Sequence, residues 1–235
     1  MKGLVVILLF SLFFVPSFAI QEYPKPDKLC ALTFDDGPDA RLTPRVLDKL
    51  EKYNVVATFF LVGQRINSSV KPVLDRMVAM GCEFGNHSWD YNPMDKMDPE
   101  MIKEYIKRTN ETIQAYTGKV PQFFRPPNLA VSRTMFDVID MPFVSGVLGF
   151  DWAGCDRTPE NIANNVLKGI KDGAIILLHD VQPEPHPTPE ALDILIPALK
   201  KMGYEFVTLT ELFKRKGVDP KDPKYKYKLW VYVEP

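Results

Sequence analysis

Residues 29–38 read LCALTFDDGP, an almost wholly apolar run followed at once by two aspartates and a Gly-Pro pair. A strand that is apolar on both faces is typical of a parallel sheet covered by helices on both sides. In parallel α/β folds, functional residues gather at the C-terminal ends of the strands, where Asp35 and Asp36 stand here. This stretch therefore predicts an α/β fold and the place of its functional site.

Six further apolar runs repeat the pattern. The predicted strands are residues 29–34, 55–62, 82–84, 122–124, 144–150, 174–178 and 204–209. Between them lie helical segments with recognisable ends: we expect N-caps before proline at Asp98, Thr158 and Thr188, and helix ends at Gly81, Gly118 and Gly203. This alternation predicts a single α/β domain, built either as a doubly wound parallel sheet or as a closed barrel.

The N-terminus has the layout of a secretory signal peptide. Lys2 precedes an apolar run, and the segment ends in the small-x-small sequence Ser17-Phe18-Ala19. The run is short for the roughly 20 apolar residues that a membrane span needs. We expect residues 1–19 to be removed, the mature protein to be secreted, and no membrane attachment to remain.

The rest of the chain suits one domain of residues 28–214, preceded by a linker (20–27) and followed by a tail or linker (215–235). The tail ends in the alternating sequence KLWVYV (228–233), which fits either a last edge strand or the approach to a further module. The 29 Lys and Arg residues nearly balance the 30 Asp and Glu residues, and no basic stripe marks a nucleic-acid face. We expect a monomer with no nucleic-acid partner.

The cysteines do not form a disulfide framework, because there are three of them and they cannot all pair. Cys30 and Cys82 lie in apolar, strand-like contexts, and Cys155 lies outside the predicted strands. We interpret Cys30 and Cys82 as buried structural thiols. A Cys30–Cys82 bridge and a reactive thiol are the alternatives.

Five of the seven predicted strands end in charged or metal-binding side chains. Besides the two aspartates, His87, Arg125, Asp151 and His179 each follow a strand. These positions include two of only three histidines in the chain. A plain solvated rim is the alternative, but their coincidence favours an active site.

The residue types restrict the chemistry. No G-x-S-x-G sequence presents a serine nucleophile and no glycine-rich loop cradles phosphate. Asp and His side chains suit a divalent cation such as zinc. One of Asp35 and Asp36 can bind the cation while the other acts as base, oriented by Arg125. His179, with Asp151 to hold its tautomer, suits a general acid, so the set indicates metal-assisted hydrolysis by activated water.

The motifs TFDDGP (33–38), HSWDY (87–91), RPP (125–127), FDW (150–152) and LLH (177–179) resemble, in order, the five motifs of the polysaccharide deacetylases. This is carbohydrate esterase family 4, also called NodB-like, and the resemblance covers about residues 28–214. It implies an irregular (β/α) barrel of about seven parallel strands.

The resemblance also implies roles for individual residues. Asp36 and His87 would hold a divalent metal ion, zinc or cobalt, with Asp35 as the catalytic base and Arg125 as its positioning partner. His179 would be the general acid, supported by Asp151. The substrate pocket would be formed by Trp152, Leu177, Pro126, Asn128 and Tyr91.

Three positions depart from the family's common pattern. Tyr91 stands where a second histidine ligand is usual, Asn128 replaces an aromatic residue, and Leu148 replaces an aspartate. A phenol with a pKa near 10 is a poor zinc ligand at neutral pH, so we expect water in that position. Nothing in the spacing requires the nearby Asp90 to bind metal.

The segments FFRPPNLAVS (123–132) and HDVQPEPHPTPEALD (179–193), together with HSWDY, resemble the acetylxylan-esterase branch of the family, in which one histidine and one aspartate hold the metal. The implied function is removal of O-acetyl groups from acetylated xylan or its oligomers. One alternative is an N-deacetylase of chitin oligomers or peptidoglycan; another is a non-catalytic carbohydrate-binding protein. His186, in the loop after the acid strand, is more often a packed or solvated residue than a substrate contact.

Overall fold

The structure is a computed structural model that describes residues 23–154 and 156–234. The predicted signal peptide, residues 1–19, and Cys155 lie outside the described residues. No helix among the described residues is both long enough and apolar enough to cross a membrane.

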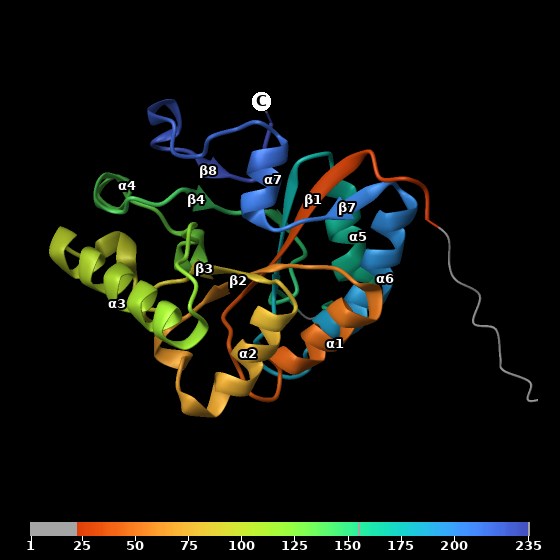
Figure 1. Cartoon of the computed structure of the whole chain (residues 1–235), viewed down its shortest axis with the longest axis horizontal. Helices are drawn as coiled ribbons and strands as arrows, with labels where there is room; N and C mark the ends of the chain where they lie inside the picture. Colours follow the sequence, from red (N-terminus) through yellow and green to blue (C-terminus); the bar gives the residue numbers. More distant parts are fainter. Residues whose placement is uncertain (1–22, 155, 235) are drawn as a thin grey trace, which may run out of the picture.

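A parallel sheet forms the centre of the molecule (Figure 1). Strand β1 (Lys28–Asp35) lies between β2 (Thr58–Leu61) and β6 (Ala174–His179), with β3 (Glu83–Asn86) beyond β2 and β5 (Val147–Leu148) beyond β6. Strand β7 (Tyr204–Phe206) pairs with the first residues of β1. Because β1 and β6 run in register from Cys30–Ala174 to Asp35–His179, the two strands bring Asp35 and His179 side by side.

Short links extend this sheet into an irregular barrel. Strands β4 (Phe143–Val144) and β8 (Leu229–Trp230) pair with each other in parallel. Phe124 bridges Asn86 of β3 to Phe143 of β4, and the N–H of Ile175 in β6 donates to the carbonyl of Val231. The structure therefore confirms the α/β fold and chooses the barrel over the open doubly wound sheet.

The helices lie outside the strands (Figure 1). They are α1 (Thr43–Tyr53), α2 (Lys71–Ala79), α3 (Pro99–Thr117), α4 (Arg133–Val138), α5 (Pro159–Gly169), α6 (Thr188–Lys201) and α7 (Leu209–Arg215). Short 3-10 turns cover Gly63–Arg65 (η1), Ser68–Val70 (η2), Met94–Lys96 (η3), Pro127–Leu129 (η4) and Pro223–Tyr225 (η5).

Two of the three predicted N-caps are confirmed. The carboxylate of Asp98 accepts from the N–H of Met101 at 2.9 Å, and the hydroxyl of Thr158 accepts from the N–H of Asn161 at 3.2 Å. The third is wrong: α6 begins at Thr188, follows Pro187 and has no side-chain cap. The Thr188 hydroxyl is used elsewhere, because the buried carboxylate of Asp151 accepts its proton at 2.7 Å.

The predicted strand 144–150 is two strands. After Val144 the N–H of Ser145 donates to the carbonyl of Trp230, whereas Val147 and Leu148 pair with β6. The chain thus changes its pairing partner within this stretch. The predicted strand 122–124 contributes only the bridge at Phe124.

The two faces of the sheet bury separate apolar clusters. Cys30, Leu32 and Phe34 face the helices, in a cluster that includes residues of α1, α2, α5 and α6, while Ala31 faces Phe60 and Trp230 on the other side. Cys30 and Cys82 are buried and free, so the prediction of structural thiols is confirmed for these two residues.

The tail packs against the same body. Trp230 and Val233 are completely buried in one cluster with Val218 and Phe213. Of the two interpretations of KLWVYV, the structure shows the strand, and the packed domain continues past residue 214 because these apolar side chains cover the second cluster.

Candidate active site

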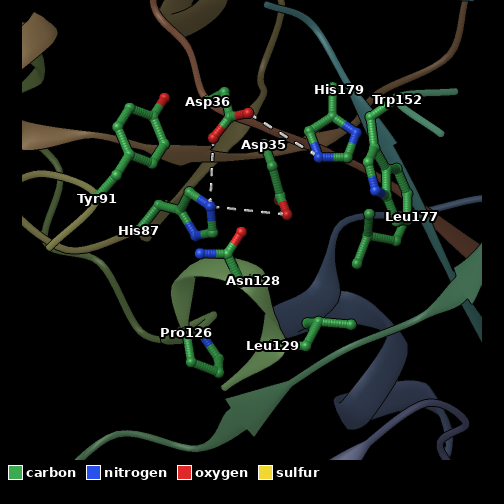
Figure 2. Close-up of a pocket in the computed structure, with 10 residues that line it drawn as sticks. All are labelled: Asp35, Asp36, His87, Tyr91, Pro126, Asn128, Leu129, Trp152, Leu177 and His179. Carbon is green, nitrogen blue, oxygen red and sulfur yellow. Dashed lines mark ion pairs between the residues drawn. The ribbon is translucent and has the colours of Figure 1, made fainter. Parts of the chain in front are cut away.

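A cavity of about 240 Å³ opens at the C-terminal ends of the strands (Figure 2). Nine predicted site residues line it: Asp35, Asp36, His87, Tyr91, Pro126, Asn128, Trp152, Leu177 and His179. The other two, Arg125 and Asp151, contact Asp35 and His179 from behind. The structure therefore brings the whole predicted set together.

His87 and Asp36 face each other across the floor of the cavity. The Nε2 atom of His87 lies 3.5 Å from Oδ1 of Asp36 and 3.9 Å from Oδ2 of Asp35 (Figure 2). The other ring nitrogen, Nδ1, lies 2.7 Å from the carbonyl oxygen of Arg125. A carbonyl only accepts, so Nδ1 carries the proton and the lone pair of Nε2 points into the cavity.

These donors fit a divalent cation. Two ligands that each bind zinc at about 2.0–2.2 Å lie roughly 3.4 Å apart in tetrahedral geometry, close to the separation of His87 Nε2 and Asp36 Oδ1. Within residues 23–154 and 156–234 no group of three or more His, Cys, Asp or Glu side chains could hold a metal. A cation at this place would have the imidazole of His87 and the carboxylate of Asp36 as ligands.

The electrostatics of the site also favour positive charge. Burial would lower the pKa of His87, but the carboxylates of Asp35 and Asp36 outweigh it and raise that pKa. Burial would raise the pKa of Asp36, but the hydrogen bond and charge of His87, with the charge of His179, hold it below its usual value. The carboxylates that favour a proton here would also favour a cation.

Asp35 is held by one arginine. Nη1 of Arg125 donates to Oδ1 of Asp35 at 2.6 Å, and Nη2 donates to the carbonyl of Ser145 at 2.7 Å. Arg125 is completely buried, and its guanidinium lies over the ring of Phe60, 4.1 Å from the centroid. The second oxygen of Asp35 is thus left facing His87 and the cavity.

His179, next to Asp35 on the neighbouring strand, is held by Asp151. Its Nδ1 lies 2.9 Å from Oδ1 of the fully buried Asp151, and its Nε2 lies 4.0 Å from Oδ2 of Asp36. Burial favours neutral imidazole, but the charge and hydrogen bond of Asp151 outweigh it and raise the pKa of His179 from 6.5 to about 9. His179 therefore tends to hold a proton at neutral pH, as a general acid must.

Tyr91 lines the cavity, and its phenol is poorly suited to bind a metal. Burial, followed by the charge of Asp36, raises the pKa of its phenol well above the usual value of 10. Its Oη accepts from Nε of Arg65 at 3.3 Å. Asp90 is turned to a local network with Asn92 and Tyr105, and does not line the cavity.

His186 is a packed residue. It is 2 % exposed and its Nε2 lies 3.3 Å from the carbonyl oxygen of His179, behind the cavity wall. Of the two expected states of His186, packed or solvated, the structure shows the packed one.

Backbone strain is concentrated around the cavity. Among the described residues, six non-glycine residues have positive φ, and only Asn54, at a helix end, is remote from the site. The other five are Asp36, Ser88, Asn128, Leu129 and Phe150, which line the cavity or adjoin residues named above. Such conformations cost about 1–3 kcal/mol each and persist where the surroundings enforce them.

Several residues of the site gave no signal in the sequence. Leu129 lines the cavity, and Ser145 accepts from Arg125 through its carbonyl. Thr188 donates to Asp151, Gln182 donates to Thr188, and Asp180 packs against Gly37. For Leu129 the signal was its place in the loop after RPP. The other residues reach the site through contacts between segments that are distant in the sequence, which no local pattern shows.

The chain is similar to proteins of known structure. The structure of a family 4 acetyl xylan esterase from Clostridium thermocellum, in complex with a cobalt ion, is 58% identical. The match covers 88% of this chain and 99% of that chain, with a TM-score of 0.84. The barrel fold is thus shared with these structures.

Curated relatives are longer. The bifunctional xylanase/deacetylase of Pseudobutyrivibrio xylanivorans is 46% identical over 207 residues, which is 88% of this chain and 33% of that protein. The peptidoglycan-N-acetylglucosamine deacetylase PgdA of Listeria monocytogenes is 36% identical over 203 residues, 85% of this chain and 42% of that protein. The chain therefore spans well under half the length of these two relatives.

A family model for polysaccharide deacetylases matches residues 22–141, the part of the chain that carries TFDDGP, HSWDY and RPP. Together with the matching barrel and the identities above, this match settles the family that the motifs suggested. The chain belongs to the polysaccharide deacetylase family.

Proposed function

We propose that this protein is an exported, divalent-metal-dependent esterase that removes O-acetyl groups from acetylated xylan or its oligomers. The observation that carries the proposal is that Asp35, held by Arg125, and His179, held by Asp151, lie side by side at the cavity. A base and an acid thus both lie next to the Asp36–His87 pair.

Asp35 is the base in this proposal. Arg125 fixes one of its oxygens and leaves the other directed at the cavity. That oxygen can accept a proton from water as the water attacks the acetyl carbonyl carbon. Asp36 and His87 hold the cation, which, when bound, supplies Lewis acidity to the carbonyl and to water.

His179 is the acid. It gives the proton on Nε2 to the sugar oxygen as the bond from that oxygen to the acetyl carbon breaks, so acetate and a free hydroxyl are the products. Asp151 at Nδ1 stabilises the imidazolium before this transfer. Trp152, Leu177, Pro126 and Asn128 line the space for the acetyl group and the sugar that bears it.

The ester substrate is favoured by the likeness to the acetyl xylan esterase and the xylanase/deacetylase. It also suits a site with two protein ligands, because an ester is a better electrophile than an amide and needs less activation. The leader-like residues 1–19 support export.

An N-deacetylase is the second candidate, because the chain is also 36% identical to PgdA. The two can be separated by measuring acetate released by the zinc- or cobalt-loaded protein from acetylated xylan and from an N-acetylglucosamine oligomer. We expect release from xylan alone, and release mainly from the amino sugar would instead establish the second candidate.

A non-catalytic carbohydrate-binding protein is the third candidate, and the variant Asp35→Asn tests it. This variant should abolish acetate release and leave xylo-oligosaccharide binding within about twofold, since the amide keeps the shape of the base but cannot accept the proton. A wild-type protein that binds the oligosaccharide and releases nothing would favour the third candidate.

A further inference from the structure

The carboxylate of Asp151 has more partners than His179 Nδ1. Its Oδ2 accepts from the backbone N–H of His179 at 2.8 Å and from the hydroxyl of Thr188 at 2.7 Å. Asp151 and Thr188 are both completely buried. These hydrogen bonds are therefore shielded from bulk water, where each is electrostatically stronger.

Two more residues set the direction in which Thr188 donates. Arg157 has only donors, so Nη1, 3.3 Å from Oε1 of Gln182, requires the amide oxygen on that side. The amide nitrogen of Gln182 then faces Thr188 and donates to its Oγ1 at 2.8 Å. Since a hydroxyl has a single proton, that of Thr188 is directed to Asp151. The hydrogen bonds from Arg157 through Gln182 and Thr188 to Asp151 therefore all run in one direction, and Asp151 accepts from both Thr188 and His179.

The Thr188 hydroxyl does not cap its own helix. Thr188 opens α6, and no side chain caps the start of that helix. A threonine next to a helix start ordinarily stabilises it by accepting from a backbone N–H. Its orientation toward Asp151 therefore needs an explanation at the site rather than in the helix.

We propose that Thr188 is a positioning residue for the general acid: its hydroxyl, oriented by Gln182 and Arg157, fixes the carboxylate of Asp151 so that His179 presents Nε2 to the leaving oxygen. This inference rests on the proposed function, because it requires His179 to protonate that oxygen. Without the hydroxyl, Oδ2 of Asp151 keeps one donor. The carboxylate can then rotate, and the imidazole loses its fixed direction.

The test compares two leaving groups. A sugar alkoxide must be protonated as it departs, whereas 4-nitrophenolate leaves without help from an acid. Loss of acid positioning should therefore slow hydrolysis of an acetylated xylo-oligosaccharide and spare 4-nitrophenyl acetate. Damage to the metal site or to the base would slow both substrates.

The variants are made in the zinc-loaded, full-length mature protein. Thr188→Val removes the hydroxyl with little change in volume, and Thr188→Ser restores it. Thr208→Val is the matched control, because the Thr208 hydroxyl caps α7 by accepting from the N–H of Glu211 at 3.3 Å. For Thr188→Val we expect kcat on the oligosaccharide to fall by roughly tenfold or more, with kcat on the aryl ester within about twofold.

Thr188→Ser should recover most of the lost kcat, and Thr208→Val should change neither rate. Parallel losses on both substrates, or no loss on the oligosaccharide, would overturn the proposal. If Thr188→Val does not fold, Gln182→Glu decides, since its carboxylate competes with Asp151 for the Thr188 proton and should give the same selective loss. A wild-type protein inactive on the oligosaccharide would contradict the proposed function itself, whereas an active wild type with an unchanged rate ratio in the variants would contradict only the role of Thr188.

Discussion

The backbone carbonyl of Arg125 accepts a hydrogen bond from Nδ1 of His87 at 2.7 Å, while the side chain of the same arginine donates to Asp35 at 2.6 Å. One residue thus orients both the imidazole expected to bind the metal and the carboxylate expected to act as base. The two contacts use different parts of Arg125, so substitution can separate them.

Arg125→Lys should lower kcat by roughly a hundredfold, because an ammonium cannot contact both Asp35 and the Ser145 carbonyl with the same planar geometry. Zinc affinity, measured by calorimetry, should change by less than about threefold, since the carbonyl that orients His87 is retained. A loss of zinc binding as large as the loss of kcat would show that the two contacts are not separable.

Asp151→Asn should move the alkaline limb of kcat/KM to lower pH. Asp151 raises the pKa of His179 to about 9 against the opposing effect of burial. Without the charge of Asp151, burial lowers the pKa of His179. His179 then loses the proton that it needs as an acid at a lower pH. A pH profile that keeps its alkaline limb in this variant would exclude His179 as the titrating acid.

The same shift affects stability. The folded-state pKa of His179 lies above its unfolded value, so its contribution is fully present below pH 6.5 and is lost as the pH rises through about 9. Urea unfolding of the wild type and of Asp151→Asn at pH 6 and pH 9.5 measures this contribution to the free energy of unfolding. We expect the wild type to lose more stability between the two pH values than the variant, and equal losses would contradict the assignment.

Tyr91→His should add a third protein ligand and raise zinc affinity by at least roughly tenfold, since neutral imidazole binds zinc well and the Tyr91 phenol does not. Ester turnover should not rise with it, because the open positions already serve water and substrate. Tyr91→Phe, which adds no ligand, is the control. A many-fold gain in both zinc affinity and ester turnover would show that the wild-type site lacks a ligand that the reaction needs.

Gly37→Ala should disturb the turn that carries Asp36. A Cβ atom at residue 37 would lie 2.3 Å from Oδ2 of Asp180, which is fully buried and accepts from the Thr43 hydroxyl at 2.5 Å. We expect a loss of about 1–3 kcal/mol in the free energy of unfolding, together with weaker zinc binding.

Gly118→Ala is the matched control for Gly37→Ala. Gly118 has a φ of 70° and open space around its Cβ position, so only backbone strain of about 1 kcal/mol is expected. Its zinc affinity should equal that of the wild type. Unchanged zinc affinity in Gly37→Ala would show that the contact between Gly37 and Asp180 does not affect the metal site.

The strand ends could be predicted because a charged residue interrupts an apolar run, and this is a local signal. Asp35, His87, Arg125, Asp151 and His179 all follow such runs. Three of them line the cavity, and Arg125 and Asp151 contact Asp35 and His179 from behind. The barrel could not be chosen from the runs alone, because a run does not show its pairing partners: Phe124 bridges β3 to β4, and Val231 accepts from Ile175, across segments far apart in the sequence.

Contacts between distant segments explain the errors. Thr188 precedes a proline as an N-cap should, yet its hydroxyl is turned away from the helix: it donates to Asp151, 37 residues earlier, and accepts from Gln182 rather than from a backbone N–H of the helix. Likewise, residues 144–150 read as one strand, but β8 and β6 compete for the chain and divide it. Local propensity gave way in both cases to tertiary hydrogen bonding.

The most direct test of the central claim is acetate release from acetylated xylan by the mature protein after chelation and after zinc or cobalt is returned. The two-ligand site predicts that chelation abolishes release and that either metal restores it, with Asp36→Ala inactive throughout. Release that survives chelation, or no release with metal present, would contradict the account.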